Sequence, residues 1–353
     1  MKKGWEVKTL EECIDSVPST NKILKKNFKI EGEYPVISQE AEIISGYWDK
    51  TDDVFTVDSP VVVYGDHTRV VKYIDFDFVR GADGVKILKP KPFLNSRYLY
   101  YFLNFCEVKH LGYARHYRLL KGLEVVYPAL SEQKRIVKIL DEKFAEIEKL
   151  KKVTEEQLAS AKELFENRLN EVFVSDTKRK QILLSDILKL EYGKPLDRSD
   201  RSDRSAEGAY PVYGANGIKA YSEKYFCDQE GIVVGRKGSA GEVTLTQTKF
   251  WPLDVTYFVT FDRNQNNLAY IFYLLKSLKL QQYATGVKPG LNRNDAYAIR
   301  INYESLGEQL KVVKELDKLS KQTKDLEAIF MKKVTELEEL KKSYLHEAFS
   351  GNL

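Results

Sequence analysis

Leu130-Ser131-Glu132-Gln133 begins a charged stretch that contains no proline or glycine for more than 40 residues. A similar stretch begins at Leu306-Gly307-Glu308-Gln309, 176 residues later, and the same shift aligns Leu140-Asp141 with Leu316-Asp317. Because 176 is half of the 353 residues, we predict two tandem copies of one plan. Each copy is a folded region followed by a long helix.

Apolar residues in both stretches recur at alternating spacings of three and four, which is typical of the a/d seam of a left-handed coiled coil. Each helix would extend roughly 60 Å at about 1.5 Å per residue, too far to be buried inside one small domain. Two matching seams in one chain predict that the helices pack against each other, antiparallel. The predicted seam residues are Leu140, Ile147, Leu150, Ala161, Leu164, Leu316, Leu319, Leu326, Phe330, Leu337 and Leu340.

The predicted fold class is therefore α+β, with two mixed α/β domains and a pseudo-two-fold internal repeat. We place the domains, called head one and head two, at residues 1–130 and 175–305, and the long helices at 131–174 and 306–353. The pseudo-two-fold axis of such a helix pair predicts heads at opposite ends. A charged stalk with no particular role is the alternative, but the symmetry argues against it.

Both heads show short strands, turns and one short helix in the same order. In head one we expect strands at Tyr34–Ile37, Val61–Tyr64, Val70–Tyr73 and Gly84–Leu88, and a helix at Ser96–Asn104. In head two we expect strands at Tyr210–Val212, Gly231–Gly235 and Val255–Phe261, a helix at Leu268–Leu278, and a flexible loop at Asp197–Ser205.

Composition restricts the class of protein without identifying it. Apolar residues make up 43% of the chain, which is enough for folded cores, and the net charge of +4 permits nucleic-acid binding without requiring it. Three widely spaced cysteines suggest neither a disulfide framework nor a zinc site and fit a reducing cytoplasm. No signal peptide and no apolar run of about 20 residues is present, so we expect no membrane association.

No catalytic motif is recognisable. The sequence has no GxxxxGK[ST], HExxH or GxSxG, and its four histidines lack the spacing of metal ligands. The glycine-rich Gly235–Gly241 has a misplaced lysine for a nucleotide loop. We therefore predict no catalytic residue, no metal site and no cofactor in this chain, which would not be an enzyme.

Basic and polar residues cluster in loops at equivalent places of the two heads. Glycines let backbone N–H groups approach phosphates, Lys and Arg neutralise phosphate charge, and Arg and Asn can pair with purine edges. Ordinary polar turns are the alternative for each cluster taken alone. The candidate DNA-binding residues are His67, Thr68, Arg69, Arg115, His116 and Arg118 in head one, and Arg236, Lys237, Ser239, Lys288, Asn292, Arg293 and Asn294 in head two.

Over essentially its whole length the chain resembles the specificity subunit of type I restriction-modification systems. The resemblance rests on Leu130–Val137 (LSEQKRIV), the ending Leu340–Gly351, and the turns Gly65–Arg69 and Gly235–Gly241, taken in this order. It implies two target-recognition domains separated by conserved helical regions, without catalysis of their own. Because Leu353 follows closely on the second helix, terminal segments found in some members are expected to be short or missing.

The resemblance also implies partners. Two modification subunits that bind S-adenosylmethionine would dock on the helices, as would restriction subunits that hydrolyse ATP with Mg. We predict a cytoplasmic scaffold whose heads enter the major groove of double-stranded DNA at half-sites about 34 Å, or ~10 bp, apart. The site would be bipartite and asymmetric, with an unread gap. The alternative is a two-headed coiled-coil adaptor that binds proteins.

Overall fold

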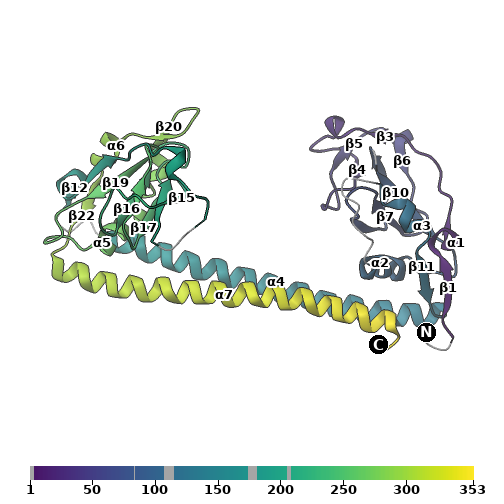
Figure 1. The fold of residues 1–353 in the computed structure, drawn as a ribbon. Helices are drawn as coiled ribbons and strands as arrows, with labels where there is room; N and C mark the ends of the chain where they lie inside the picture. The colour runs from purple at the N-terminus through teal and green to yellow at the C-terminus, as the bar shows by residue number, and fades with distance from the viewer. Residues whose placement is uncertain (1–3, 83, 107–114, 174–180, 205–207) are drawn as a thin grey trace. The chain divides into compact units, whose positions relative to one another are not determined.

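The chain divides into two units, and each combines one head with part of both long helices (Figure 1). Unit one comprises Met1–Thr154 and Lys332–Leu353, and unit two comprises Glu155–Met331. The computed structural model describes residues 4–82, 84–106, 115–173, 181–204 and 208–353. The predicted boundary at residues 174 and 175 lies outside the described residues.

The long helices are α4 (Leu130–Phe173) and α7 (Leu306–Ser350). They run antiparallel in each unit. The residue numbers of the ion-pair partners fall along α7 as they rise along α4. The pairs are Glu148 with Lys341 and Lys151 with Glu338 (3.2 Å) in unit one, and Lys162 with Glu327 (2.7 Å) and Arg168 with Glu315 (2.8 Å) in unit two. The predicted α+β class with two long antiparallel helices is confirmed.

The helix seam follows a different set of side chains from the predicted one at four positions. Leu140, Ile147, Leu316 and Leu337 are buried, and Ala161, Leu319 and Phe330 are partly buried. Leu150, Leu164, Leu326 and Leu340 are instead 46%, 64%, 38% and 40% exposed.

The correction at these positions has a geometric cause. The 3-4 spacing has two phases, and the chain follows the one that passes through partly buried Lys151 and Phe165 on α4 and Lys341 on α7. The four leucines therefore lie beside the seam. Leu150 corresponds to Leu326 and Leu164 to Leu340 under the shift of 176, so both copies deviate identically.

The described residues of head one form three small sheets. A four-stranded sheet has the order β2-β10-β7-β8, a five-stranded sheet has β3-β9-β4-β5 with β6 paired to β9, and β1 pairs with β11. The strands are β1 (Glu6–Thr9), β2 (Ile14–Asp15), β3 (Lys22–Ile23), β4 (Tyr34–Ile37), β5 (Gly46–Trp48), β6 (Val54–Phe55), β7 (Val61–Gly65), β8 (Val71–Ile74), β9 (Phe78–Gly81), β10 (Val85–Pro90) and β11 (Glu124–Tyr127). The helices are α1 (Leu10–Cys13), α2 (Ser96–Phe105) and α3 (Tyr117–Lys121).

Head two repeats the four-stranded sheet and the two-stranded sheet of head one, and its other sheets differ. Its four-stranded sheet has the order β13-β19-β16-β17, a three-stranded sheet has β15-β14-β18, and β12 pairs with β22 and β20 with β21. The strands are β12 (Gln181–Leu183), β13 (Lys189–Tyr192), β14 (Tyr210–Gly214), β15 (Gly217–Ser222), β16 (Gly231–Gly235), β17 (Val243–Thr246), β18 (Trp251–Pro252), β19 (Thr256–Thr260), β20 (Ala284–Thr285), β21 (Gly290–Leu291) and β22 (Arg300–Asn302). The helices are α5 (Leu268–Ser277) and α6 (Arg293–Tyr297).

The stretch predicted as a flexible loop, Asp197–Ser205, is ordered over its described part. A 3-10 turn forms at Arg198–Asp200, and Ser202 exchanges two backbone hydrogen bonds with Tyr221, each 2.8 Å long. Ser205 itself lies outside the described residues. The prediction was wrong for the rest because long-range pairing with β15 overrides the local polarity.

A buried glutamine joins each head to its long helix. The Gln133 side chain, 0% exposed, accepts from the Asn95 backbone N–H (2.8 Å) and donates to the carbonyls of Phe93 (2.9 Å) and Pro128 (2.8 Å). In head two, Gln309 is equally buried. It accepts from the Asn267 N–H (2.9 Å) and donates to the Gln265 (3.2 Å) and Glu304 (2.9 Å) carbonyls.

A second contact joins the short helix of each head to the long helix. The hydroxyl of Tyr101 on α2 donates to Asp141 on α4, and the hydroxyl of Tyr273 on α5 donates to Asp317 on α7 at 2.7 Å. Figure 1 shows α2 and α5 lying between the sheets of their heads and the long helices. Each head is thus mounted on its helix by the same two contacts.

Candidate nucleic-acid interface

The two candidate clusters of head two, far apart in the sequence, lie side by side. The turn after β16 and the hairpin β20–β21 are hydrogen-bonded through Leu291 N–H to the Arg236 carbonyl (2.9 Å) and Gly238 N–H to the Pro289 carbonyl (2.9 Å). Lys237 also forms a β-bridge with Gly290. The structure therefore brings the residues around Arg236 together with those around Arg293.

Two arginines of this surface contact one aromatic ring. The guanidinium carbons of Arg236 and Arg293 lie 4.7 and 4.9 Å from the ring centroid of Tyr192, the last residue of β13. The Arg236 Nη1 also donates to the Asp254 carbonyl (2.9 Å). Such cation–π contacts hold guanidinium groups in place while leaving their edges open to an acceptor.

The other candidates of head two are mostly exposed. Lys237, Lys288 and Asn294 are exposed and Ser239 is partly exposed. Asn292 is also exposed, and its side chain accepts from the Asn294 N–H at 3.0 Å, which caps the N-terminus of α6.

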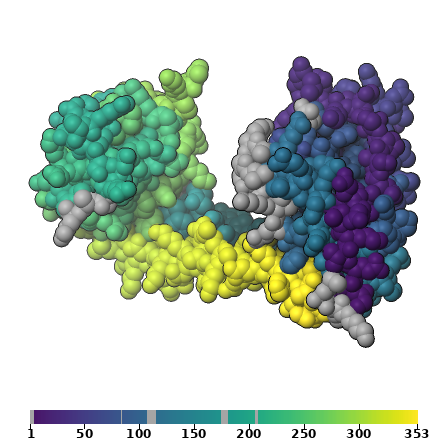
Figure 2. All heavy atoms as spheres, turned by 45° about the vertical axis from the view of Figure 1, so that its right-hand side comes forward, coloured from purple at the N-terminus to yellow at the C-terminus, as the bar shows by residue number. Residues whose placement is uncertain are grey.

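The hairpin β20–β21 extends this surface. Gly286 at its tip has φ +94°, a conformation that favours glycine, and the next residue, Val287, is fully exposed. In Figure 1 the loop beside β20 projects from the body of head two, and Figure 2 shows it as a light-green protrusion. A two-stranded β-ribbon can enter the major groove of DNA, and this hairpin carries the exposed Lys288.

In head one the turn after β7 is held by a neighbouring loop. The Thr68 hydroxyl donates to the Gln39 carbonyl (2.5 Å), and the His67 N–H donates to the Gln39 side-chain oxygen (3.1 Å). Arg69 has φ 63°, which is uncommon for a residue with a side chain. The turn is therefore fixed in one shape.

His116 does not belong to an exposed interface, which corrects its assignment as a DNA-binding residue. The side chain is 0% exposed, and its Nδ1 lies 3.0 Å from the carbonyl oxygen of buried Asp66, which also accepts from the His116 N–H (2.9 Å). The Asp66 carboxylate accepts from the Tyr117 N–H (2.7 Å). A partner 50 residues away therefore makes this histidine structural.

The neighbouring cations of head one remain available to a ligand. Arg115 and Arg118 are exposed. Lys86 lies 3.8 Å from the Asp66 carboxylate and 5.1 Å from the ring centroid of Tyr117. In head one, the turn after the central strand β7 thus lies beside the residues around α3. In head two, the turn after the central strand β16 lies in the same way beside the residues around α6.

Sequence reasoning missed Tyr192, Gln39 and Asp66. The chain has 22 tyrosines, and nothing in the neighbourhood of Tyr192 along the chain distinguishes it from the others. Asp66 stands inside the predicted turn, but its role depends on residues 116 and 117. Only the tertiary structure could reveal these three residues.

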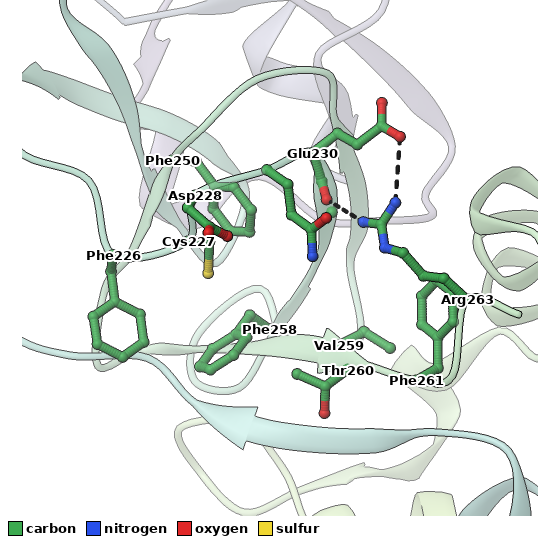
Figure 3. Close-up of a pocket in the computed structure, with 12 residues that line it drawn as sticks. Phe226, Cys227, Asp228, Glu230, Phe250, Phe258, Val259, Thr260, Phe261 and Arg263 are labelled. Atoms are coloured by element: carbon green, nitrogen blue, oxygen red, sulfur yellow. Dashed lines mark hydrogen bonds and ion pairs between the residues drawn. The ribbon is translucent and has the colours of Figure 1, made fainter.

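A pocket of about 250 Å³ lies beside β19 in head two (Figure 3). The Arg263 guanidinium, at its rim, donates to the Glu230 carbonyl (2.6 Å) and lies 3.4 Å from the Glu230 carboxylate, so its charge is already paired. Burial raises the pKa of the Cys227 thiol, which also lines the pocket, to about 12. The thiol is therefore protonated at neutral pH and a poor nucleophile.

Among the described residues, no group of three His, Cys, Asp or Glu side chains could hold a metal ion. None of the helices in the described ranges combines the length and apolar content needed to cross a bilayer.

The comparisons with known proteins agree with this geometry. A model described as the type I restriction modification DNA specificity domain matches residues 2–157 and 178–337. The chain belongs to this family. The specificity subunit of the EcoprrI type I restriction enzyme of Escherichia coli is 25% identical over 150 residues, which is 42% of this chain and 37% of that relative. The match therefore spans well under half of the relative's length.

Two solved structures share the fold of this family member. The HsdS subunit from Thermoanaerobacter tengcongensis aligns over 100% of this chain and 98% of its own, with a TM-score of 0.54 and 15% identity. A chain from a study of complex assembly and conformational transition of the type I R-M system aligns over 100% and 99%, with a TM-score of 0.77 and 14% identity. At this identity the likeness concerns the fold.

Proposed function

We propose that this chain is the DNA-reading subunit of a type I restriction-modification complex. The observation that carries the proposal is the repeated surface in which each head joins the turn after its central strand to the residues around its last short helix. In both heads this surface presents exposed cations, which suit DNA phosphates. The family match indicates that the ligand is DNA. Neither this match nor the solved relatives favour a protein-binding adaptor.

The DNA site is bipartite and asymmetric in this proposal. Each head reads a few base pairs in the major groove, and the helix pair fixes an unread gap, with half-sites about 34 Å or ~10 bp apart. The heads carry different residues on equivalent surfaces, such as Arg118 and Asn294, so the half-sites differ in sequence. Each lost base contact should cost about 1–3 kcal/mol of discrimination.

The partners are two modification subunits and restriction subunits. S-adenosylmethionine, ATP and Mg belong to those partners, and this chain is the non-catalytic member of a cytoplasmic assembly. The modification subunit would flip an adenine out of the duplex for methylation. The role of this chain is to place that subunit at a chosen sequence.

The exposed leucines of the long helices support two equivalent docking places. Leu150 follows Asp141, the residue that holds α2, by nine residues, or two and a half turns, which places it on the opposite side of α4. Leu326 follows Asp317 by the same interval on α7. Leu340 is also exposed, and the ion pairs around it place it level with Leu150 in unit one.

Unit two has the equivalent pair, Leu164 and Leu326, next to the Lys162–Glu327 ion pair. Two like pairs of exposed leucines, one in each unit, match two copies of one partner. The double substitution Leu150→Arg, Leu340→Arg should reduce the complex to one modification subunit. Adding Leu164→Arg and Leu326→Arg should remove both, as measured by the mass of the purified complex.

Leu310→Arg serves as the control, because Leu310 is exposed but lies sixteen residues before Leu326, about 160° around α7. It should retain both modification subunits. A fourfold variant that still bound two copies would show that these leucines do not form the docking surface.

A methylome measurement tests the function as a whole. The chain is co-expressed with its modification subunit in a host without DNA methylation, and the chromosome is sequenced for modified bases. A split, asymmetric methylated motif is the expected result. A soluble complex that methylates no motif would argue against the proposed function.

A further inference from the structure

Head two contains two arginines held against one tyrosine at the junction of three segments. Tyr192 ends β13, Arg236 begins the turn after β16, and Arg293 begins α6. Tyr192 is 46% exposed, and the guanidinium carbons of the two arginines lie 4.7 and 4.9 Å from its ring centroid. The three side chains therefore form one solvent-accessible group. The two arginines of this group, Arg236 and Arg293, are here called the arginine pair.

The backbones that carry the arginine pair are fixed. The Arg236 N–H donates to the Val255 carbonyl (2.9 Å), and the Arg236 carbonyl accepts from Leu291 (2.9 Å). Arg293 follows the Asn292 cap at the first position of α6. The Tyr257 hydroxyl donates to the Leu291 carbonyl (3.0 Å) beneath the group. The guanidinium positions thus follow from the fold.

The two guanidinium groups beside one ring repel each other, and within the described part of the chain neither forms an ion pair with a carboxylate. Contact with the negative face of the ring offsets part of this cost. An acceptor supplied by a ligand would relieve the repulsion. The group is therefore prepared for a partner rich in hydrogen-bond acceptors.

We propose that Tyr192 is a positioning residue that aligns Arg236 and Arg293 to read guanine in the half-site of head two. This inference rests on the proposed function. Stacking on a ring fixes the plane of a guanidinium and leaves its in-plane N–H groups to bond the guanine O6 and N7 together. A lysine can contact a phosphate as a point charge without such alignment, and the nearby exposed Lys237 and Lys288 can supply that contact.

Among its described residues, head one has no equivalent group at the corresponding place. There β2 pairs with β10 only at Lys89 and Pro90, whereas Val85 is the residue opposite Gly65. In head two, β13 pairs with β19 as far as Tyr192, which is opposite Tyr257. The next residue before Tyr257 is Thr256, which is opposite Gly235 at the end of β16. Tyr192 stands at that extension. The guanine contact should therefore belong to one half-site only.

The test compares Tyr192→Leu with Tyr192→Phe in the full chain bound to its modification subunit. Phenylalanine keeps the ring and should preserve the wild-type motif. Leucine should relax one or two base pairs of a single half-site, with about tenfold or greater loss of discrimination against the wrong base. The methylome of each variant gives the motif, and thermal unfolding shows whether the variant is folded.

Binding to oligonucleotides distinguishes a contact with guanine from a contact with phosphate. Replacing the relevant guanine with 7-deazaguanine, which lacks the N7 acceptor, should weaken wild-type binding but not the binding of Arg293→Gln. The salt dependence of Tyr192→Leu binding should remain unchanged. A shallower salt dependence with unchanged base discrimination would identify a phosphate contact and overturn the proposal.

The same experiments distinguish failure of this inference from failure of the proposed function. A wild-type complex that methylates a split motif while folded Tyr192→Leu and Arg293→Gln keep that motif unchanged would overturn the inference alone. A wild-type complex that methylates no motif would contradict the function as well.

Discussion

The two heads use one position of the repeat in opposite ways. His116 and Asn292 correspond under the shift of 176, and each precedes a five-residue helix. His116 is buried and holds Asp66, whereas Asn292 is exposed and caps α6. At the junction with the long helix, in contrast, Gln133 and Gln309 make the same contacts. The mounting of the heads is fixed, and the surface facing solvent has diverged.

This contrast separates positioning from recognition. A glutamine that bonds three backbone groups cannot change without leaving some of them unsatisfied, so the junction admits few alternatives. In head two the turn after β16 bonds mostly through backbone atoms, so its side chains can vary without loss of the fold. Such a division allows one scaffold to carry two different DNA specificities.

The junction should give the largest effect on stability. Gln133→Leu leaves the Asn95 N–H and two carbonyl groups without their partner, and each buried unsatisfied group costs about 1–3 kcal/mol. Gln309→Leu should have a similar cost in head two. Chemical denaturation measures the loss, and hydrogen exchange shows which head opens.

The control is Gln157→Leu, the same substitution at an exposed position of α4, which should change stability by less than about 0.5 kcal/mol. If Gln133→Leu were as mild as this control, the two heads would not depend on the glutamine contact. A large effect in one head only would break the equivalence of the junctions.

The next effect concerns the position at which the heads differ. His116→Ala should destabilise head one by about 1–3 kcal/mol, because it removes a buried side chain and its bond to Asp66. Arg118→Ala, two residues away and exposed, should leave stability unchanged and make DNA binding less dependent on salt. Thermal unfolding and binding at several salt concentrations measure the two effects.

Asn292→Ala is the matched variant of head two. It removes only a helix cap, so we expect a loss of about 1 kcal/mol. If His116→Ala altered DNA affinity while stability stayed at the wild-type value, the assignment of His116 as structural would be wrong.

Much of the fold could be predicted because it is encoded in local periodicity. Charged stretches without proline or glycine give the long helices, and the shift of 176 gives the two copies. The phase of the seam could not be predicted, because Leu150 and Lys151 both satisfy a 3-4 pattern and only packing selects between them. Polar residues such as Gln133 carry no local sign that they will be buried.

The candidate interface shows the same limit. The loops of head two were predicted from their glycines and cations, and the structure places Arg236 beside Arg293. Tyr192, which holds both, lies 44 residues before Arg236 and 101 before Arg293. His116 was assigned to the interface wrongly, because its structural partner Asp66 is 50 residues away and cannot be recognised from the local sequence. Local patterns identify the loops, and long-range contacts decide the role of each side chain.

The smallest expected effect compares ion pairs between the long helices. In unit two the Arg168 Nε and Nη2 bond the two Glu315 oxygens at 2.8 and 3.1 Å, and this contact lowers the pKa of Glu315. In unit one the single Lys341 amine bonds Glu148 and lowers its pKa. Glu315→Gln should destabilise unit two by about 0.2–1 kcal/mol at pH 7, and Glu148→Gln should cost less, because only Arg168 bonds both carboxylate oxygens.

The lowered pKa of Glu315 determines how the stability difference between Glu315→Gln and the wild type changes with pH. A carboxylate whose folded pKa is lowered stabilises the fold above its ordinary pKa of about 4.3, and this contribution is lost as the pH falls through the folded pKa. The stability difference between Glu315→Gln and the wild type should therefore be present at pH 7 and vanish in acid. Glu163→Gln, at an exposed position of α4, is the control. A difference that persisted unchanged through the acid range would show that Glu315 acts through packing, and the two units would then differ in shape complementarity at the helix pair, with charge playing no part.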